Sequence, residues 1–125
     1  MSCSVTTREI DRLTIVELRG RFTMADASDV IWGAVSDLLA AGRKHILLEL
    51  SNVTYLDSAA GIGELVRSYT TALRHGAKVK LLRPGKNVSR VLRIVGLDRV
   101  FEIFDDETTA LRSFEESTPV SAATL

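Results

Sequence analysis

The chain of 125 residues has one cysteine, two prolines and no surplus of either charge. A single cysteine, Cys3, cannot form an internal disulfide, so the sequence predicts a reducing, cytoplasmic setting. Sixteen basic residues balance sixteen acidic ones, which removes the attraction that a nucleic-acid or anionic-membrane binder needs. No apolar run approaches the ~20 residues that span a bilayer, and the polar N-terminus does not resemble a secretory signal. We therefore expect neither a nucleic-acid-binding protein nor a membrane protein.

The usual constellations of catalytic residues are also missing. No Gly-x-Ser-x-Gly elbow surrounds Ser58, and no cysteines, histidines and carboxylates have metal-binding spacing. His45 and His75 are predicted at a strand start and a helix end, where surface residues are commoner than bases. Gly61 and Gly63 lack the third glycine of a dinucleotide fingerprint, and we interpret them as allowing close backbone approach. We expect no cofactor, no metal and no enzymatic activity.

What is present is an alternation of strand-like and helix-like segments. Two strands within residues 4–19 are joined by a tight turn at 9–12, and so short a connection makes them antiparallel. Further strands are expected at 45–50, 78–82 and 100–104, and helices beginning near residues 23, 57, 86 and 105. The order predicts an α/β fold, with a mostly parallel sheet, an antiparallel first strand and four covering helices. Residues 1–116 form the single domain, and 117–125 are expected to be a flexible tail.

Apolar spacings of three and four assign a buried face to each helix. The stripe of the second helix consists of Ile62, Leu65, Val66, Tyr69, Ala72 and Leu73. The stripe of the third helix consists of Val88, Val91, Leu92 and Val95. Trp32 lies at the edge of the first helix's stripe and is either a rim aromatic or a partner contact. Ile94 lies off the third stripe beside Arg90.

The junction after the strand at 45–50 carries a serine, Ser58, directly after Asp57. In α/β folds, ligands and chemistry gather where a strand leads into a helix N-terminus. A phosphate there brings a charge of about −1.5 to −2, which free N–H groups tolerate but a desolvated partner surface does not. From the pattern alone two interpretations stay open. Ser58 is a phosphorylation site that controls binding, or it only caps its helix.

The residues around this serine resemble the signature of bacterial anti-sigma factor antagonists, which are single STAS domains. Residues 52–58, NVTYLDS, are followed by GIG at 61–63. The family pattern is an apolar residue, then Asp-Ser-Ser/Thr/Ala-Gly-Leu/Ile-Gly. The likeness also includes the segments 75–77, 95–97 and 100–101. It covers roughly residues 5–115 in the right order of elements and implies a STAS fold.

The resemblance implies partner switching. In that family the unphosphorylated domain binds an ATP-using serine kinase that is also an anti-sigma factor, and this binding releases a sigma factor. The kinase phosphorylates the serine after the aspartate and breaks the complex, and a serine phosphatase reverses the step. Carried over to this sequence, Asp57 matches the aspartate, Ser58 the phosphoacceptor, and Gly61 and Gly63 the two glycines. The resemblance also implies a monomer or weak dimer in the cytoplasm.

The expected partner-binding loop consists of Asp57, Ser58, Ala59, Ala60, Gly61, Ile62 and Gly63. Candidates for additional partner contact are Thr23, Trp32, Arg90 and Ile94. Thr23 occupies the position where the family usually has an aspartate near the phosphoacceptor, and with Asp26 it has capping-box spacing. The resemblance therefore implies that the contribution of that family aspartate is lost here.

The second departure from the family is one additional residue. Ala59 and Ala60 stand where the family has a single residue between the serine and the first glycine. Alignment from the aspartate keeps Ser58 as the acceptor, whereas alignment from the glycines puts Ala59 there. One residue turns a helix by about 100°, so we predict that a bulge in the loop accommodates it.

Two other functions remain open. One is a STAS scaffold that is never phosphorylated, as a subunit of a transport or stress-signalling assembly, and the additional alanine motivates it. The other is nucleotide binding by the domain itself, which rests on the family resemblance alone.

Overall fold

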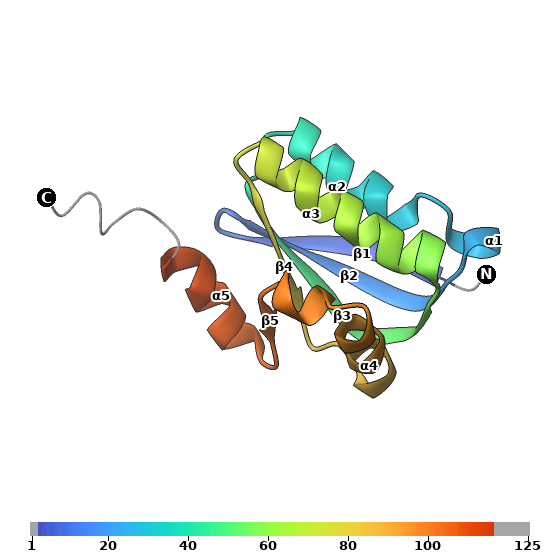
Figure 1. Cartoon of the computed structure of the whole chain (residues 1–125). Coiled ribbons are helices and arrows are strands. Elements are labelled where there is room, and N and C mark those ends of the chain that lie inside the picture. The colour runs from blue at the N-terminus through green and yellow to red at the C-terminus, as the bar shows by residue number, and fades with distance from the viewer. Residues whose placement is uncertain (1–2, 117–125) are drawn as a thin grey trace, which may run out of the picture.

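The computed structural model describes residues 3–116, which form one five-stranded sheet covered by helices (Figure 1). The strands are β1 (Cys3–Ile10), β2 (Leu13–Phe22), β3 (His45–Leu56), β4 (Lys78–Leu82) and β5 (Ile103–Phe104). The α-helices are α1 (Met24–Ala27), α2 (Val30–Ala40), α3 (Glu64–Arg74), α4 (Lys86–Ile94) and α5 (Glu107–Glu116). A π-helical segment, η1 (Ser58–Gly63), precedes α3, and a 3₁₀ turn, η2 (Leu97–Arg99), follows α4. The expected tail at 117–125 lies outside the described residues.

The strands lie in sequence order, β1-β2-β3-β4-β5. β1 and β2 are antiparallel, with Ile10 paired to Leu13, and the remaining neighbours are parallel. Asp11 adopts the left-handed conformation, φ 55°, that such a short hairpin turn requires. The predicted mixed sheet with an antiparallel first strand is confirmed.

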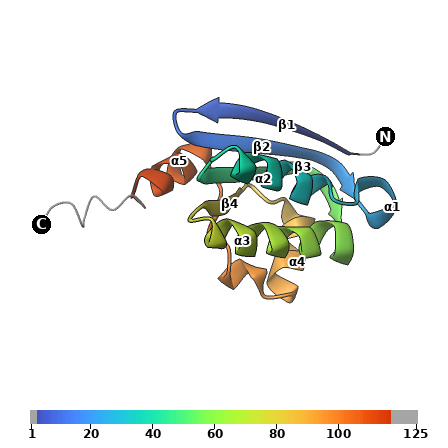
Figure 2. The ribbon, with the colours of Figure 1, turned by 90° about the horizontal axis from the view of Figure 1, so that it is seen from above.

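Both faces of the central strands are buried, which explains their continuous apolar sequence. Alternate residues of β3 point to opposite faces, so Ile46, Leu48 and Leu50 join one core cluster and Leu47 joins another. α2 and α3 lie side by side over the face of the larger cluster (Figure 2). On the other face, Ala110 and Phe114 of α5 pack with the smaller cluster.

β3 is longer than the sequence predicted. It continues beyond residue 50 to Leu56, which pairs with Phe22 at the end of β2. This extension runs past the end of β4 and pairs only with β2, so polar residues such as Asn52 and Thr54 remain exposed. The sequence becomes polar after residue 50 because one side of the strand is exposed there, and the strand itself continues.

The expected helix from Thr23 is divided in two. α1 ends at Ala27, and Asp29 adopts a left-handed conformation, φ 64°, before α2 begins at Val30. Asp29 tolerates this conformation better than most residues because its short polar side chain can bond locally. The four expected helical regions are all present, and only the first is interrupted.

The expected strand at 100–104 is mostly wrong. Only Ile103 and Phe104 pair with β4, and Val100, at the end of η2, is 43% exposed. Phe101 is buried in the larger cluster without being in a strand. Phe101 reaches the core from an irregular turn, and the apolar spacing around it resembles that of a buried strand.

Three helical positions predicted to be buried are exposed. Val66, Leu73 and Val95 are 39%, 55% and 49% exposed. α3 instead packs through Leu65, Ala72 and the fully buried Ser68, because it lies against another helix and its small residues allow close approach.

Candidate partner-binding site

The carboxylate of Asp57 connects three segments at the C-terminal end of β3. Its Oδ1 accepts a hydrogen bond from the N–H of Ala60 at 2.6 Å and thereby caps η1. Its Oδ2 accepts from the N–H of Met24 at 2.7 Å, at the start of α1. The backbone N–H of Asp57 donates to the carbonyl oxygen of Phe22 at 3.1 Å. Asp57 therefore holds together the connections that follow β2 and β3.

The additional alanine is accommodated inside the helix. The N–H of Ile62 donates to the carbonyl oxygen of Asp57 at 3.0 Å, five residues earlier, which is the π-helical pattern. A π-helical turn holds one more residue than an α-helical turn and is frequent at functional sites. The prediction of a local bulge is correct, but the bulge is the first turn of the helix and not a loop.

Gly61 is required by close packing within this turn. A Cβ atom on Gly61 would lie 2.7 Å from Cδ2 and 2.8 Å from Cβ of Leu56, which is buried at the end of β3. A Cβ on Gly63 would lie 3.3 Å from the carbonyl oxygen of Ser58. Close packing is therefore present at Gly61, where the nearest atoms belong to the Leu56 side chain and the Leu56 Cα atom is 3.1 Å away. At Gly63 the close backbone atom belongs to the same helical turn, not to a neighbouring segment.

Ser58 is the first residue of η1, and its side chain is exposed. Asp57, not Ser58, is the cap of this helical segment, so the interpretation of Ser58 as a helix cap is wrong. Within residues 3–116 the Ser58 hydroxyl makes no hydrogen bond. Two large apolar side chains are exposed nearby. Met24, 55% exposed, hydrogen-bonds to Asp57 through its N–H, and Tyr55, 44% exposed, lies at the end of β3 directly before Asp57. Methionine and tyrosine are enriched at protein interfaces.

Glu64 is a site residue that the sequence reading missed. Glu64 lies directly after η1 and is only 7% exposed. Its two carboxylate oxygens accept hydrogen bonds from the N–H groups of Asp29 and Trp32 at 2.6 and 3.0 Å. Backbone N–H groups at the start of a helix need an acceptor, and the side chain of the N-cap residue Asp29 supplies none here. Glu64 supplies it instead, with a negative charge that the helix dipole favours. The only sequence signal was a charged residue beside the buried Leu65. Glu64 therefore links the end of η1 to α2.

Trp32 is half-buried and stacks against Arg67 of α3, with the guanidinium carbon 4.2 Å from the ring centroid. Arg67 also lies 3.9 Å from a carboxylate oxygen of Asp29. The contact fits a rim aromatic at the α2–α3 seam, and it leaves part of the ring accessible.

The remaining candidates are divided between two places. Thr23 stands between Phe22 and Met24, both of which hydrogen-bond to Asp57, so it lies beside the site. Arg90 and Ile94 lie one turn apart on α4, which packs on β3, and Ile94 is 74% exposed. The structure thus brings together Thr23 and the 57–63 segment, whereas Arg90 and Ile94 form a separate exposed stripe.

Among the residues that the structure describes, no group of histidine, cysteine and carboxylate side chains could hold a metal ion. Within the same part of the chain, no helix has the length and apolar character needed to cross a membrane.

Curated relatives of this chain include proteins named as anti-sigma factor antagonists. A Thermotoga neapolitana protein named as a candidate anti-sigma factor antagonist is 34% identical over 79 residues, which are 63% of this chain and 69% of that protein. The anti-sigma F factor antagonist of Paenibacillus polymyxa is 31% identical over 72 residues, which are 58% of this chain and 61% of the relative. The matches thus span about two thirds of the relatives' length.

Solved structures share the fold. A crystal structure of an anti-sigma factor antagonist from Mycobacterium paratuberculosis superposes with a TM-score of 0.79 at 20% identity, covering 90% of this chain and 93% of the other. The murine solute carrier 26 member A9, an anion transporter, matches with a TM-score of 0.68 at 17% identity. There the match covers 88% of this chain but 19% of the transporter, so the same fold also occurs as one part of a larger protein.

The predicted resemblance is confirmed by the family comparison. The sequence model of the STAS domain matches residues 4–110, which include every strand from β2 to β5 and the whole 57–63 segment. With this match and the mixed sheet described above, the chain belongs to the STAS domain family.

Proposed function

We propose that this chain is an anti-sigma factor antagonist that is switched off by phosphorylation of Ser58. In its unphosphorylated form it binds an anti-sigma factor that is also an ATP-using serine kinase, and a serine phosphatase restores that form. The protein acts in the cytoplasm as a binding module and not as an enzyme. The names of its relatives in the family support the general role.

The observation that carries the proposal is the free, exposed hydroxyl of Ser58 beside the fixed carboxylate of Asp57. Because the Ser58 hydroxyl makes no hydrogen bond within residues 3–116, a phosphate can be added there without breaking one. The phosphate brings a charge of about −1.5 to −2 beside an existing carboxylate. Burying that charge against a partner is costly, so the modification weakens binding and leaves the fold intact.

The position of the additional residue supports Ser58, and not Ala59, as the acceptor. The bonds that fix Asp57 run to Phe22, Met24 and Ala60, and they set the backbone directly before Ser58. The π-helical turn takes up the additional residue after Ser58, between it and Gly63. These features support alignment from the aspartate.

Binding of variants to the cognate anti-sigma kinase tests the proposal. We expect Ser58→Asp to weaken the complex strongly, and Ser58→Ala to bind like the unmodified protein even when ATP and the active kinase are present. Ser4→Asp adds the same charge at an exposed position of β1 and serves as the matched control, with unchanged binding expected. Equal binding by Ser58→Asp and Ser58→Ala would overturn the switch.

A second function follows from the occurrence of this fold within an anion transporter. In that case the chain is a scaffold subunit of a transport or stress-signalling assembly. It would purify from its native host in fixed stoichiometry with that assembly, and Ser58→Asp would leave the association unchanged.

A further inference from the structure

Two adjoining hollows lie at the end of the sheet opposite to Ser58. They surround the β1–β2 turn and the start of β3, whereas Ser58 follows the end of β3. The first, here called the apolar chamber, has a volume of about 560 Å³. The second, here called the basic recess, has a volume of about 450 Å³. Both volumes are within the range of small-molecule sites, about 300–1,000 Å³.

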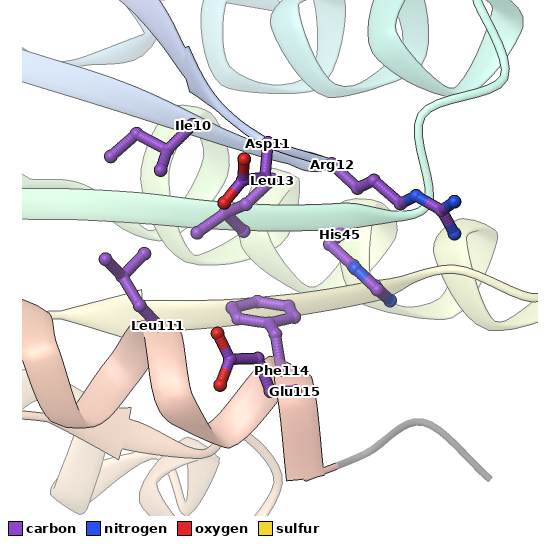
Figure 3. A pocket seen from close by; sticks show the side chains of 8 residues that line it. All are labelled: Ile10, Asp11, Arg12, Leu13, His45, Leu111, Phe114 and Glu115. Carbon is purple, nitrogen blue, oxygen red and sulfur yellow. The ribbon is translucent and has the colours of Figure 1, made fainter. Parts of the chain in front are cut away.

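The apolar chamber lies between the β1–β2 turn and α5 (Figure 3). Its apolar walls are Ile10, Leu13, Leu111 and Phe114, and Leu111 and Phe114 come from α5. The ring centroids of Phe114 and His45 are 5.3 Å apart. Such a surface favours an apolar chain or ring over a polar molecule, because it offers area and few hydrogen-bond partners.

The basic recess has a different chemistry. It is lined by Arg12, Arg43, Lys44, His45 and two glycines, with no acidic residue among them. Arg12 and His45 also line the apolar chamber, so the two hollows share a wall. In Figure 3 the side chains of Arg12 and His45 point to the same side, away from Ile10 and Leu111. The apolar and cationic surfaces are therefore continuous.

Two of the cations already have partners. Lys44 donates to the carbonyl oxygen of His75 at 2.5 Å. Arg43 donates to the hydroxyl of Thr14 at 2.9 Å and lies 3.5 Å from a carboxylate oxygen of Glu9. Arg12 differs, because within residues 3–116 its guanidinium makes no hydrogen bond or ion pair. Arg12 is thus available to a ligand at the junction of the two hollows.

The cations around this junction affect the pKa of His45. Burial is the first cause that lowers the pKa of its imidazole, and the charges of Lys78, Lys80, Arg12 and Arg43 lower it further. An anion placed beside His45 is attracted by the same cations. Glu9, 3.5 Å from Arg43, and Glu102, 3.4 Å from Lys80, offset part of that attraction, so Arg12 and Lys78 contribute most of it. The field therefore favours a negative group in the basic recess.

Two acidic residues lie beside the apolar part of the site. Asp11 and Glu115 line the apolar chamber and not the basic recess. Asp11 repels an anion inside the chamber, so a ligand with a negative head has one favourable orientation. Its apolar part lies between the β1–β2 turn and α5, and its head lies toward Arg12.

We propose that the apolar chamber and the basic recess together bind a free anionic amphiphile, a fatty-acid-type carboxylate. Its apolar chain packs against the walls from the β1–β2 turn and α5, and its carboxylate pairs with Arg12. This site is independent of Ser58 and of the proposed partner switch.

Calorimetric titration of the full chain tests the proposal, with dodecanoate below its aggregation concentration as the probe. We expect saturable binding of one dodecanoate per chain, no binding of acetate and no binding of dodecyltrimethylammonium. Arg12→Gln should weaken dodecanoate binding about tenfold, the loss of one charged hydrogen bond. Arg93→Gln, on the exposed surface of α4, is the matched control and should bind like the unmodified chain.

Backbone amide shifts in NMR spectra locate the ligand in the same titration. We expect the largest changes at Ile10, His45 and Leu111, and little change at Ser58. Absence of saturable binding, equal binding of dodecyltrimethylammonium, an unchanged affinity of Arg12→Gln, or shifts confined to other residues would each overturn the assignment.

Discussion

The carboxylate of Asp57 accepts the backbone N–H of Met24 at 2.7 Å, across 33 residues of sequence. The same carboxylate accepts the N–H of Ala60 at 2.6 Å, so one side chain fixes the start of α1 and the start of η1 together. Ser58 lies within this clamp, and its own hydroxyl is exposed. The aspartate of the signature is therefore a structural residue here, and the serine beside it is the accessible one.

Asp57→Asn should destabilise the fold by about 1–3 kcal/mol. The amide group turns one of the two acceptors into a donor that faces a backbone N–H, either that of Met24 or that of Ala60. Urea unfolding measures the change, and the exposed Asp98→Asn is the control, with a change within about 0.5 kcal/mol. Equal effects of the two substitutions would contradict the clamp.

Glu64→Gln should also cost about 1–3 kcal/mol, because the buried carboxylate accepts two N–H groups at the start of α2. An amide there satisfies one donor and opposes the other. Hydrogen exchange should show the loss first at the amides of Asp29 and Trp32. Asp37→Asn, at an exposed position of α2, should leave both stability and exchange unchanged. Uniform loosening of the whole chain, with no preference for α2, would speak against this role.

Gly61→Ala and Gly33→Ala should change stability in opposite directions. At Gly61 a Cβ overlaps Leu56, and overpacking of this kind costs about 1–3 kcal/mol. Gly33 lies inside α2 with nothing within 4 Å of an added Cβ, so alanine should stabilise the helix by up to about 1 kcal/mol. Thermal and urea unfolding of both variants decide the signs. A neutral Gly61→Ala would show that η1 is looser than its packing against Leu56 implies.

His45 should make the fold sensitive to mild acid. Burial and nearby cations lower the pKa of His45 in the folded state, so the unfolded chain binds its proton more readily. Its stabilising contribution is complete above the unfolded pKa, about 6.5, and decreases as the pH falls through that value. As the pH falls from about 7.5 to about 5, the melting temperature of His45→Gln should therefore rise relative to that of the unmodified chain. A pH-independent difference between the two proteins would refute this assignment.

The sequence predicted the order of the elements because the buried strands and helix stripes carry strong periodic patterns. Ile46, Leu48 and Leu50 mark a strand covered on both faces. These features depend on local sequence, so they can be read without knowing the tertiary contacts.

The errors fall where tertiary contacts decide. The polar part of β3, including Asn52 and Thr54, is a strand only because β2 pairs with it. The break between α1 and α2 follows from Asp29, whose N–H is taken by Glu64, 35 residues away. The orientation of α3 follows from its packing on α2, which buries Ser68 and exposes Val66. None of these contacts has a signal in the local pattern.

The candidate site was predictable in its position and not in its internal geometry. The Asp57-Ser58 pair at the end of a strand indicated where to look. The roles of the two residues depend on bonds to Met24 and Ala60, and the accommodation of the additional alanine depends on a π-helical turn. π-helical turns are rare and occur mostly as single turns within α-helices, so sequence spacing alone does not reveal this one.

Phosphopeptide mass spectrometry of the protein purified from its native host tests the central claim most directly. The proposed switch predicts phosphate on Ser58 in part of the population, with an occupancy that changes between growth and stress conditions. Such a result also assigns the acceptor despite the additional alanine. A Ser58 that stays unmodified under all conditions would contradict the switch and favour the scaffold function.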